Sequence, residues 1–256
     1  MRESDFSQLL SKYDRRDMAG FTRKFVDDLE VAISTEMGIA EDCDWSGVIC
    51  LGMGGSAAGG LFLKAISDET GGLPFVVWRD YGLPSWWGPE WLVLATSYSG
   101  GTEETLDAVK DAISGGGTIV GICSGGELEE ILAESEESVC LNVPSGQMPR
   151  SAFGYILGTQ LSACWSLGLL PEPSEEEITE MLQRLSTVSS DADLSGNSGM
   201  TATLSRSLVG KELGIVSPTC LGPAAYRFSC QLNENSAKFA RATEVPEMNH
   251  NEIVAW

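Results

Sequence analysis

Apolar residues recur at helical spacing near the start of the chain. Two sets follow this pattern: Phe6, Leu9, Leu10 and Tyr13, and then Phe21, Phe25, Leu29 and Ala32. Residues three or four positions apart lie on one face of a helix, so we predict two amphipathic helices between residues 4 and 37. Their apolar faces are expected to pack on a core that is formed later in the chain.

From residue 47 the pattern changes to short apolar runs separated by glycine-rich turns and helical segments. Strand-like runs lie within 47–55, 73–81, the first part of 91–113, 117–124 and 137–146. Helical segments lie at 56–66, the second part of 91–113, 127–134 and 148–170. Strands that alternate with helices through short turns predict an α/β fold with a doubly wound parallel sheet.

A change in composition after residue 170 divides the chain. "PEPSEEE" and then "SSDADLSGNSG" indicate a helical linker with a loop, and the segments after them predict one more strand, within 211–218, and one more helix. We therefore expect four parts: N-terminal helices at 1–40, a first α/β domain at 41–170, a linker at 171–200, and a partial α/β unit at 201–256. The last part has too few predicted strands to close a sheet of its own.

Composition narrows the possible partners. The 256 residues carry a net charge of −21, which repels phosphate backbones and anionic lipid, so we expect neither nucleic acid nor membrane binding. No stretch reaches the roughly 20 apolar residues of a membrane span, and the N-terminus is too charged for a signal peptide. Seven cysteines without a C-x-x-C motif indicate reduced thiols, a cytoplasmic location and no metal site.

The first candidate loop, "GMGGSAAGG", follows the first predicted strand. Its glycines allow close approach of a ligand, and the N–H groups of the next helix favour an anion. Gly52, Gly54 and Ala57 also fit the G-x-G-x-x-A dinucleotide fingerprint, with Asp80 as a candidate ribose ligand. A tight turn without a ligand explains the same glycines, so three interpretations stay open here.

The second candidate loop, "TSYSGGTEET", follows the third predicted strand. Ser97, Ser99 and Thr102 place three hydroxyls within six residues, and hydroxyls and amides at a helix N-terminus suit a phosphate monoester. A helix cap with two glutamates in the first turn is the alternative that needs no ligand. Because the dinucleotide interpretation leaves this loop unexplained, the two loops together favour a phosphate monoester.

Three further residues are candidates for proton transfer and charge stabilisation. Arg150 precedes an apolar helix in "QMPRSAFGY", Glu234 lies in "QLNENSAK", and His250, the only histidine, lies in "PEMNHNE". A carboxylate and an imidazole can share proton transfers, while a guanidinium can hold developing negative charge. A surface arginine and a structural histidine are the alternatives that need no chemistry.

Taken in order, these segments resemble the bifunctional phosphoglucose/phosphomannose isomerases of the sugar isomerase (SIS) domain superfamily. The two loops alone are typical of any SIS domain, whereas "QLNENSAK" and "PEMNHNEIVAW" are typical of the bifunctional group. The resemblance runs from about residue 20 to the end of the sequence. It implies a flavodoxin-like SIS domain followed by a partial second SIS domain, in a metal-free, cofactor-free homodimer.

The resemblance also implies substrates and roles. The family converts glucose 6-phosphate and mannose 6-phosphate to fructose 6-phosphate through an enediolate. The implied phosphate-site residues are Gly55, Ser56, Ser97, Ser99 and Thr102; Arg150 would stabilise the enediolate, Glu234 would move the proton between C1 and C2, and His250 of the partner subunit would assist ring opening.

Two departures from the family pattern change these expectations. Position 101 is Gly where the family usually has Asn, and the sequence ends at Trp256, before the C-terminal lysine that family members supply. We therefore expect a C-terminally shortened isomerase. A sugar-phosphate-binding SIS module without catalysis is the alternative, and a nucleotide-dependent oxidoreductase built on the first loop is a third possibility.

Overall fold

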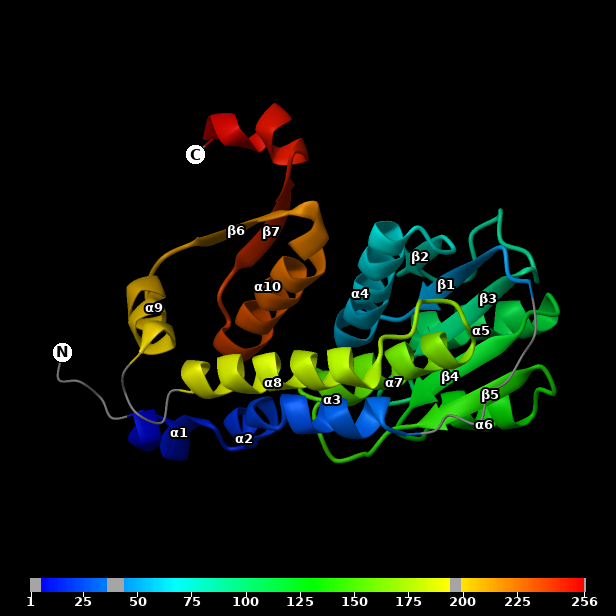
Figure 1. The fold of residues 1–256 in the computed structure, drawn as a ribbon, viewed down its shortest axis with the longest axis horizontal. Coiled ribbons are helices and arrows are strands. Elements are labelled where there is room, and N and C mark those ends of the chain that lie inside the picture. The colour runs from blue at the N-terminus through cyan, green and yellow to red at the C-terminus, as the bar shows by residue number, and fades with distance from the viewer. Residues whose placement is uncertain (1–5, 36–43, 194–198, 256) are drawn as a thin grey trace.

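The computed structural model describes residues 6–35, 44–193 and 199–255. Figure 1 shows a first α/β unit built on one sheet and a second, smaller unit that stands beside it. The helices that link the two units run along one side of the molecule. In the described ranges, no helix is both long and apolar enough to cross a membrane.

The first unit is a parallel sheet of five strands. The strands are β1 (Gly47–Leu51), β2 (Phe75–Trp78), β3 (Trp91–Thr96), β4 (Ile119–Cys123) and β5 (Ser138–Asn142), in the order β2-β1-β3-β4-β5. Every neighbouring pair is parallel. This is a doubly wound topology of the flavodoxin type, which confirms the fold predicted from the alternating pattern.

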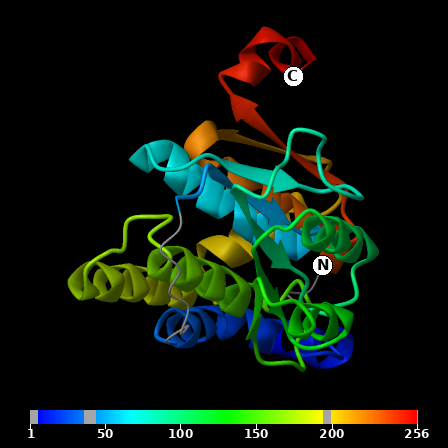
Figure 2. The same cartoon turned by 90° about the vertical axis from the view of Figure 1, so that its right-hand side faces the viewer.

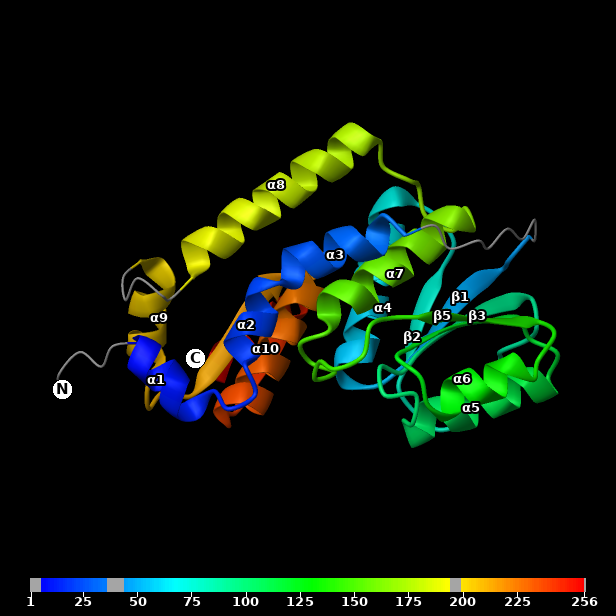
Figure 3. The same ribbon diagram turned by 90° about the horizontal axis from the view of Figure 1, so that it is seen from below.

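Both faces of this sheet are covered by helices, as Figure 3 shows. The helices are α4 (Gly54–Thr70), α5 (Glu103–Ser114), α6 (Glu127–Ala133) and α7 (Phe153–Ser166). Successive residues of a strand point to opposite faces, so Val48 and Cys50 join the core beneath α4 and α7, whereas Ile49 and Leu51 join the core beneath α5 and α6. This two-sided burial explains why the strands read as continuous apolar runs.

The N-terminal region contains three helices where the sequence predicted two: α1 (Phe6–Tyr13), α2 (Met18–Arg23) and α3 (Phe25–Ile33). The Asp14 carboxylate accepts hydrogen bonds from the amides of Met18 and Ala19, which starts a new helix just after the first one ends. The second predicted helix is also divided, at Lys24, into α2 and α3. The pattern of apolar residues could not show this second break, because Phe21 and Phe25 keep the helical spacing of four residues across it.

Helix α3 is part of the first unit in space, although it precedes the sheet in sequence. It lies against α7, where a Cβ added at Gly154 would come within 2.6 Å of the Phe25 carbonyl oxygen and one added at Gly158 within 2.5 Å of the Ala32 Cβ. Two glycines four residues apart therefore let the backbones of α3 and α7 approach closely.

The second unit follows two linking helices, α8 (Glu175–Ala192) and α9 (Met200–Leu208). It consists of β6 (Leu213–Pro218), η2 (Thr219–Leu221), α10 (Gly222–Ser236), β7 (Ala240–Val245), η3 (Glu247–His250) and η4 (Glu252–Ala255). β6 and β7 form a separate parallel pair, and α10 lies between this pair and α4 of the first unit. Figures 1 and 2 both show η3 and η4 projecting away from the first sheet.

Candidate functional site

The two candidate loops meet at the carboxyl edge of the first sheet. β1 and β3 are neighbours, and the chain turns to opposite sides after them, because β2 lies beyond β1 and β4 lies beyond β3. A Cβ added at Gly52 would lie 2.9 Å from the carbonyl oxygen of Thr96, so the loops are in direct contact. Such a switch point is where open α/β sheets bind their ligands.

The first loop delivers a helix N-terminus to this edge. Gly54 has a φ of 53°, a left-handed conformation that favours glycine, and it begins the 17-residue helix α4. The next turn buries Ser56, whose amide donates to the carbonyl of Met53 at 3.0 Å. The unpaired N–H groups and the dipole of α4 favour an anion at this position.

The second loop gathers the three hydroxyls predicted from the sequence. Ser97 Oγ and Thr102 Oγ1 lie 2.8 Å apart and are hydrogen-bonded, while Ser99 Oγ accepts from the amide of Gly101 at 3.3 Å. Thr102 precedes α5 and makes no side-chain cap bond to that helix. Its hydroxyl is therefore paired within the loop, and the loop combines clustered hydroxyls with a second helix N-terminus.

Gln160, on α7, holds the start of the second loop in place and was not predicted as a site residue. It is fully buried on α7, and its Nε2 donates to Thr96 Oγ1 at 2.9 Å. Thr96 is the last residue of β3, directly before the loop. This bond fixes the end of the strand from which the hydroxyls project. A glutamine inside an apolar helix was the available signal.

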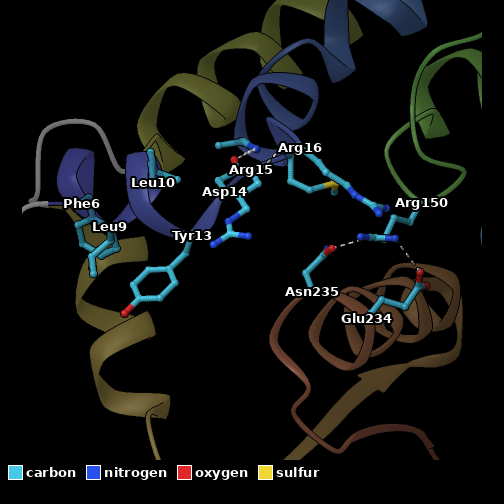
Figure 4. Close-up of a pocket in the computed structure, with 12 residues that line it drawn as sticks. Phe6, Leu9, Leu10, Tyr13, Asp14, Arg15, Arg16, Arg150, Glu234 and Asn235 are labelled. Atoms are coloured by element: carbon cyan, nitrogen blue, oxygen red, sulfur yellow. Dashed lines mark hydrogen bonds and ion pairs between the residues drawn. The ribbon is translucent and has the colours of Figure 1, made fainter.

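Arg150 and Glu234 come together across the two units, as Figure 4 shows. Arg150 Nη1 lies 4.0 Å from Glu234 Oε2, and Arg150 Nε donates to Asn235 Oδ1 at 2.6 Å. The Arg150 side chain is 26% exposed and that of Glu234 is 41% exposed. The pair is thus accessible, and it combines a carboxylate that can accept a proton with a cation that can hold negative charge.

The Arg150–Glu234 pair lines a cavity of about 620 Å³. The opposite wall comes from α1 and from the turn between α1 and α2, which contributes Arg15 and Arg16. Figure 4 shows the Arg16 side chain directed toward Arg150. The sequence analysis did not select either N-terminal arginine, because two adjacent arginines near a chain terminus do not by themselves indicate a binding site.

His250 is not brought to Glu234 within one chain. It lies exposed on η3, after the end of β7, whereas Glu234 lies near the C-terminal end of α10, where the chain turns back into β7. Figure 1 accordingly places η3 at the far end of β7 from the last turn of α10. The proton-transfer pair expected from the sequence is therefore not assembled by a single subunit.

The described residues offer no evident metal site. No three His, Cys, Asp or Glu side chains in these ranges lie close enough together to hold a metal ion. The dinucleotide interpretation gains no support at Asp80, which uses its Oδ1 to accept from the amide of Tyr81 at 2.8 Å in an exposed turn.

Comparison with known proteins places this geometry in a class. The model of the SIS domain matches residues 44–170, and the model of the bacterial phospho-glucose isomerase C-terminal SIS domain matches residues 199–256. The fold is similar to the C-terminal domain of glucosamine-fructose-6-phosphate aminotransferase from Francisella tularensis, with a TM-score of 0.66 at 17% identity over 93% of this chain and 72% of that one. It is also similar to tagatose-6-phosphate ketose/aldose isomerase from Escherichia coli, with a TM-score of 0.60 at 16% identity over 95% and 68% of the two chains. The protein is thus an SIS-domain protein.

Sequence relatives define the family more narrowly. The bifunctional phosphoglucose/phosphomannose isomerase of Caldicellulosiruptor bescii is 37% identical over 84% of this chain and 63% of its own length, and that of Aquifex aeolicus is 32% identical over 85% and 65%. A D-glucosamine-6-phosphate 4-epimerase of Sulfolobus acidocaldarius is 33% identical over 79% and 61%. The chain belongs to the bifunctional phosphoglucose/phosphomannose isomerase family, as the sequence motifs predicted, and it spans less than two thirds of the length of these relatives.

Proposed function

We propose that this chain carries the active centre of an aldose–ketose isomerase for six-carbon sugar phosphates. Its substrates would be glucose 6-phosphate, mannose 6-phosphate or both, and its product fructose 6-phosphate. The observation that carries this proposal is the Arg150–Glu234 pair, which faces a cavity on an SIS fold and whose Arg150 backbone lies close to the first loop at Gly55. Relatives that bear the name of the bifunctional isomerase support the choice of substrates.

The phosphate would bind where the two loops meet. The N–H group of Gly55 and the hydroxyl of Ser56 at the start of α4, together with the hydroxyls of Ser97, Ser99 and Thr102, would supply donors without a lysine. Binding energy at this distant group would orient the reacting carbons, because a fixed phosphate removes much of the translational and rotational freedom of the sugar.

The chemistry would take place at the Arg150–Glu234 pair. Glu234 would remove the proton from C2 of the open-chain aldose and return it to C1, while Arg150 would stabilise the negative charge of the enediolate oxygen between the two steps. A single base serves both aldoses, because glucose and mannose 6-phosphate differ only at C2 and yield the same enediolate. The step requires neither a metal nor a redox cofactor.

His250 would act in the site of a second subunit, in a homodimer. Its exposure and its separation from Glu234 support a role across an interface, at the ring oxygen of the sugar. The test is complementation between two inactive variants, Glu234→Gln and His250→Ala. Mixed dimers would contain one intact site, so co-expression should restore roughly a quarter of wild-type activity. Inactive mixtures would contradict the shared site.

We also place the enzyme in the cytoplasm. The six cysteines in the described residues are all free thiols, which is usual for a reducing compartment. Fractionation of cells that express the tagged protein would test this location, and recovery outside the cytoplasmic fraction would contradict it.

The direct test of function is an isomerase assay with EDTA present. Fructose 6-phosphate formation should be followed separately from glucose 6-phosphate and mannose 6-phosphate, for the wild-type chain and for Glu234→Gln. Activity that is lost in the variant supports the proposal. A parallel reaction with glucosamine 6-phosphate would reveal an epimerase instead, an alternative that the Sulfolobus acidocaldarius relative makes worth testing.

The second candidate function is a sugar-phosphate-binding module without catalysis. It is favoured by the position of His250, which leaves the catalytic set divided within one chain. Fructose 6-phosphate binding by calorimetry, with no turnover of any of the three sugar phosphates by a homodimer, would establish this alternative.

A further inference from the structure

Arg227 occupies the junction between the first loop, the Arg150 segment and the helix that carries Glu234. It lies on α10 seven residues before Glu234, so two helical turns place both residues on the same side of the helix. The family resemblance gives it no role, and it does not line the cavity that contains the Arg150–Glu234 pair. Its contacts nevertheless connect the elements that build the proposed site.

Three contacts define the position of the Arg227 guanidinium. Nη2 donates to the backbone carbonyl of Arg150, which also accepts from Gln231 Nε2 at 3.0 Å. The guanidinium carbon lies 4.4 Å from the ring centre of Phe153, the first residue of α7, in a cation–π contact. Nη1 points to the first loop, 3.3 Å from the position of a Cβ at Gly55.

The close approach of Arg227 Nη1 explains why residue 55 is a glycine, whereas its backbone conformation does not. Its φ is outside the left-handed region, unlike that of Gly54, so any residue could adopt the same backbone conformation. A Cβ would instead press on Arg227 Nη1 at 3.3 Å, and it would also lie 3.4 Å from the carbonyl oxygen of Pro149. Glycine at 55 therefore leaves room for the guanidinium.

The environment of Arg227 is unfavourable for an isolated charge. Burial lowers the pKa of Arg227, and the nearby charge of Glu234 acts in the opposite direction. Nη1 is buried and has no hydrogen-bond partner among the described residues. A buried charged donor that is left unpaired lowers the stability of the folded protein. This cost favours a functional reason for an arginine at position 227.

We propose that Arg227 is a positioning residue that couples the phosphate-binding first loop to Arg150 and Glu234, an inference that rests on the proposed isomerase function. It fixes the Arg150 backbone from the α10 side and limits the movement of the loop at Gly55 from the same side. Preorganisation of this kind raises the rate by holding the reacting groups in register and contributes little to ground-state affinity.

The first test compares Arg227→Met, Arg227→Lys and a control, Arg79→Met. Arg79 also makes a cation–π contact with α10, 4.7 Å from the ring centre of Tyr226, but at a site away from both loops. Arg227→Met should lower kcat for glucose 6-phosphate about tenfold or more with KM changed less than about threefold. Arg227→Lys should recover part of kcat, since an ammonium group can still reach the Arg150 carbonyl, and Arg79→Met should match the wild type.

A double-mutant cycle then tests the contact itself. Gly55→Ala should lower kcat in the wild-type background and have little further effect beside Arg227→Met, because removal of the guanidinium makes room for the methyl group. Additive losses would overturn the coupling, and so would an unchanged kcat in Arg227→Met. If Arg227→Met does not fold, a well-folded Gly55→Ala with unchanged kcat overturns the proposal.

Hydrogen exchange separates this proposal from the proposed function. Amides of residues 53–57 should exchange about tenfold faster in Arg227→Met, while those at the start of α5 should not change. This readout requires no turnover. Faster loop exchange in a chain that isomerises nothing would uphold the coupling and reject the isomerase. An active wild type with equal exchange and equal kcat in Arg227→Met would reject only the coupling.

Discussion

The two sheets of this molecule are built from different kinds of strand. β1 and β4 of the first sheet are buried along their whole length, with helices over both faces. β6 and β7 of the second unit form a two-stranded pair in which buried, half-buried and exposed residues alternate. A pair of strands alone is marginally stable in water, so the second unit depends on α10 and on its contact with α4.

This difference separates the two tasks of the proposed enzyme. The proposed phosphate loops project from the buried sheet, and the end of β3 is fixed by the hydrogen bond between Gln160 and Thr96. Glu234 and His250 lie on the smaller unit, whose position relative to the loops depends on helix packing. In the proposed enzyme, binding would thus take place on the sheet that is buried between two layers of helices, and proton transfer on the unit that is held by fewer layers.

The largest expected effect tests this separation directly. Glu234→Gln removes the base without changing the size of the side chain, so kcat should fall on the order of a thousandfold while fructose 6-phosphate binds as before. Thr102→Val removes a hydroxyl of the second loop and should weaken binding about tenfold with a smaller loss in kcat. Steady-state kinetics measures kcat of both variants, and calorimetry measures their affinity for fructose 6-phosphate.

The separation would be wrong if the two variants showed the same pattern. A loss of binding in Glu234→Gln would place the carboxylate in the ground-state complex. A thousandfold loss of kcat in Thr102→Val, with binding intact, would move the chemistry to the first unit. Thermal unfolding of each variant provides the control for folding.

Stability should follow the same division. Val93 is completely buried in β3, whereas Val216 in β6 is 43% exposed. Val93→Ala should cost about 2–3 kcal/mol in free energy of unfolding, through lost burial and the cavity that it leaves. Val216→Ala makes the same chemical change and should cost less than about 1 kcal/mol. Urea denaturation compares them, and equal costs would mean that the second sheet is covered by surfaces outside the described residues.

The same contrast explains what the sequence could and could not predict. Two-sided burial gives continuous apolar runs in β1, β3 and β4, and the half-buried edge strands β2 and β5 also contain short apolar runs, so all five strands of the first sheet were predicted. β7, with the sequence "ARATEV", has no such run and was not predicted as a strand. The two loops were found because hydroxyls and glycines cluster in sequence, whereas Arg227 acts through contacts with residues far away in the chain, which no local pattern reveals.

Adjacent glycines in the second loop should respond in opposite ways. Gly100 has a φ of 67°, and a Cβ there would lie 1.8 Å from the carbonyl oxygen of Gly125. Gly100→Ala should therefore destabilise the protein by more than about 1 kcal/mol and weaken phosphate binding. A Cβ at Gly101 would meet no atom within 4 Å, and Gly101 has no left-handed φ.

Gly101→Ala should accordingly be neutral or stabilise the protein by about 0.4–1 kcal/mol, because it restricts the unfolded chain. Gly101→Asn should be accommodated as well, since the space around this position is open. Thermal unfolding with and without fructose 6-phosphate measures both effects. A strongly destabilised Gly101→Ala would show that this loop needs the flexibility of two glycines.

The smallest effect is expected at the N-terminal wall of the cavity. Arg16 is exposed and lies on the turn opposite Glu234, where Figure 4 shows it directed toward Arg150. Its charge should attract an anionic substrate on a chain whose net charge of −21 otherwise repels it. Arg16→Gln should raise KM roughly twofold to fivefold at low salt and leave kcat unchanged, and the difference should vanish near 0.5 M salt because an exposed charge is screened.

The matched control is Lys12→Gln, which removes an exposed charge on α1 that does not line the cavity and should have no effect on KM. A salt-independent loss in Arg16→Gln would mean that Arg16 contacts the bound sugar phosphate directly, which would make the N-terminal helices a structural part of the active centre.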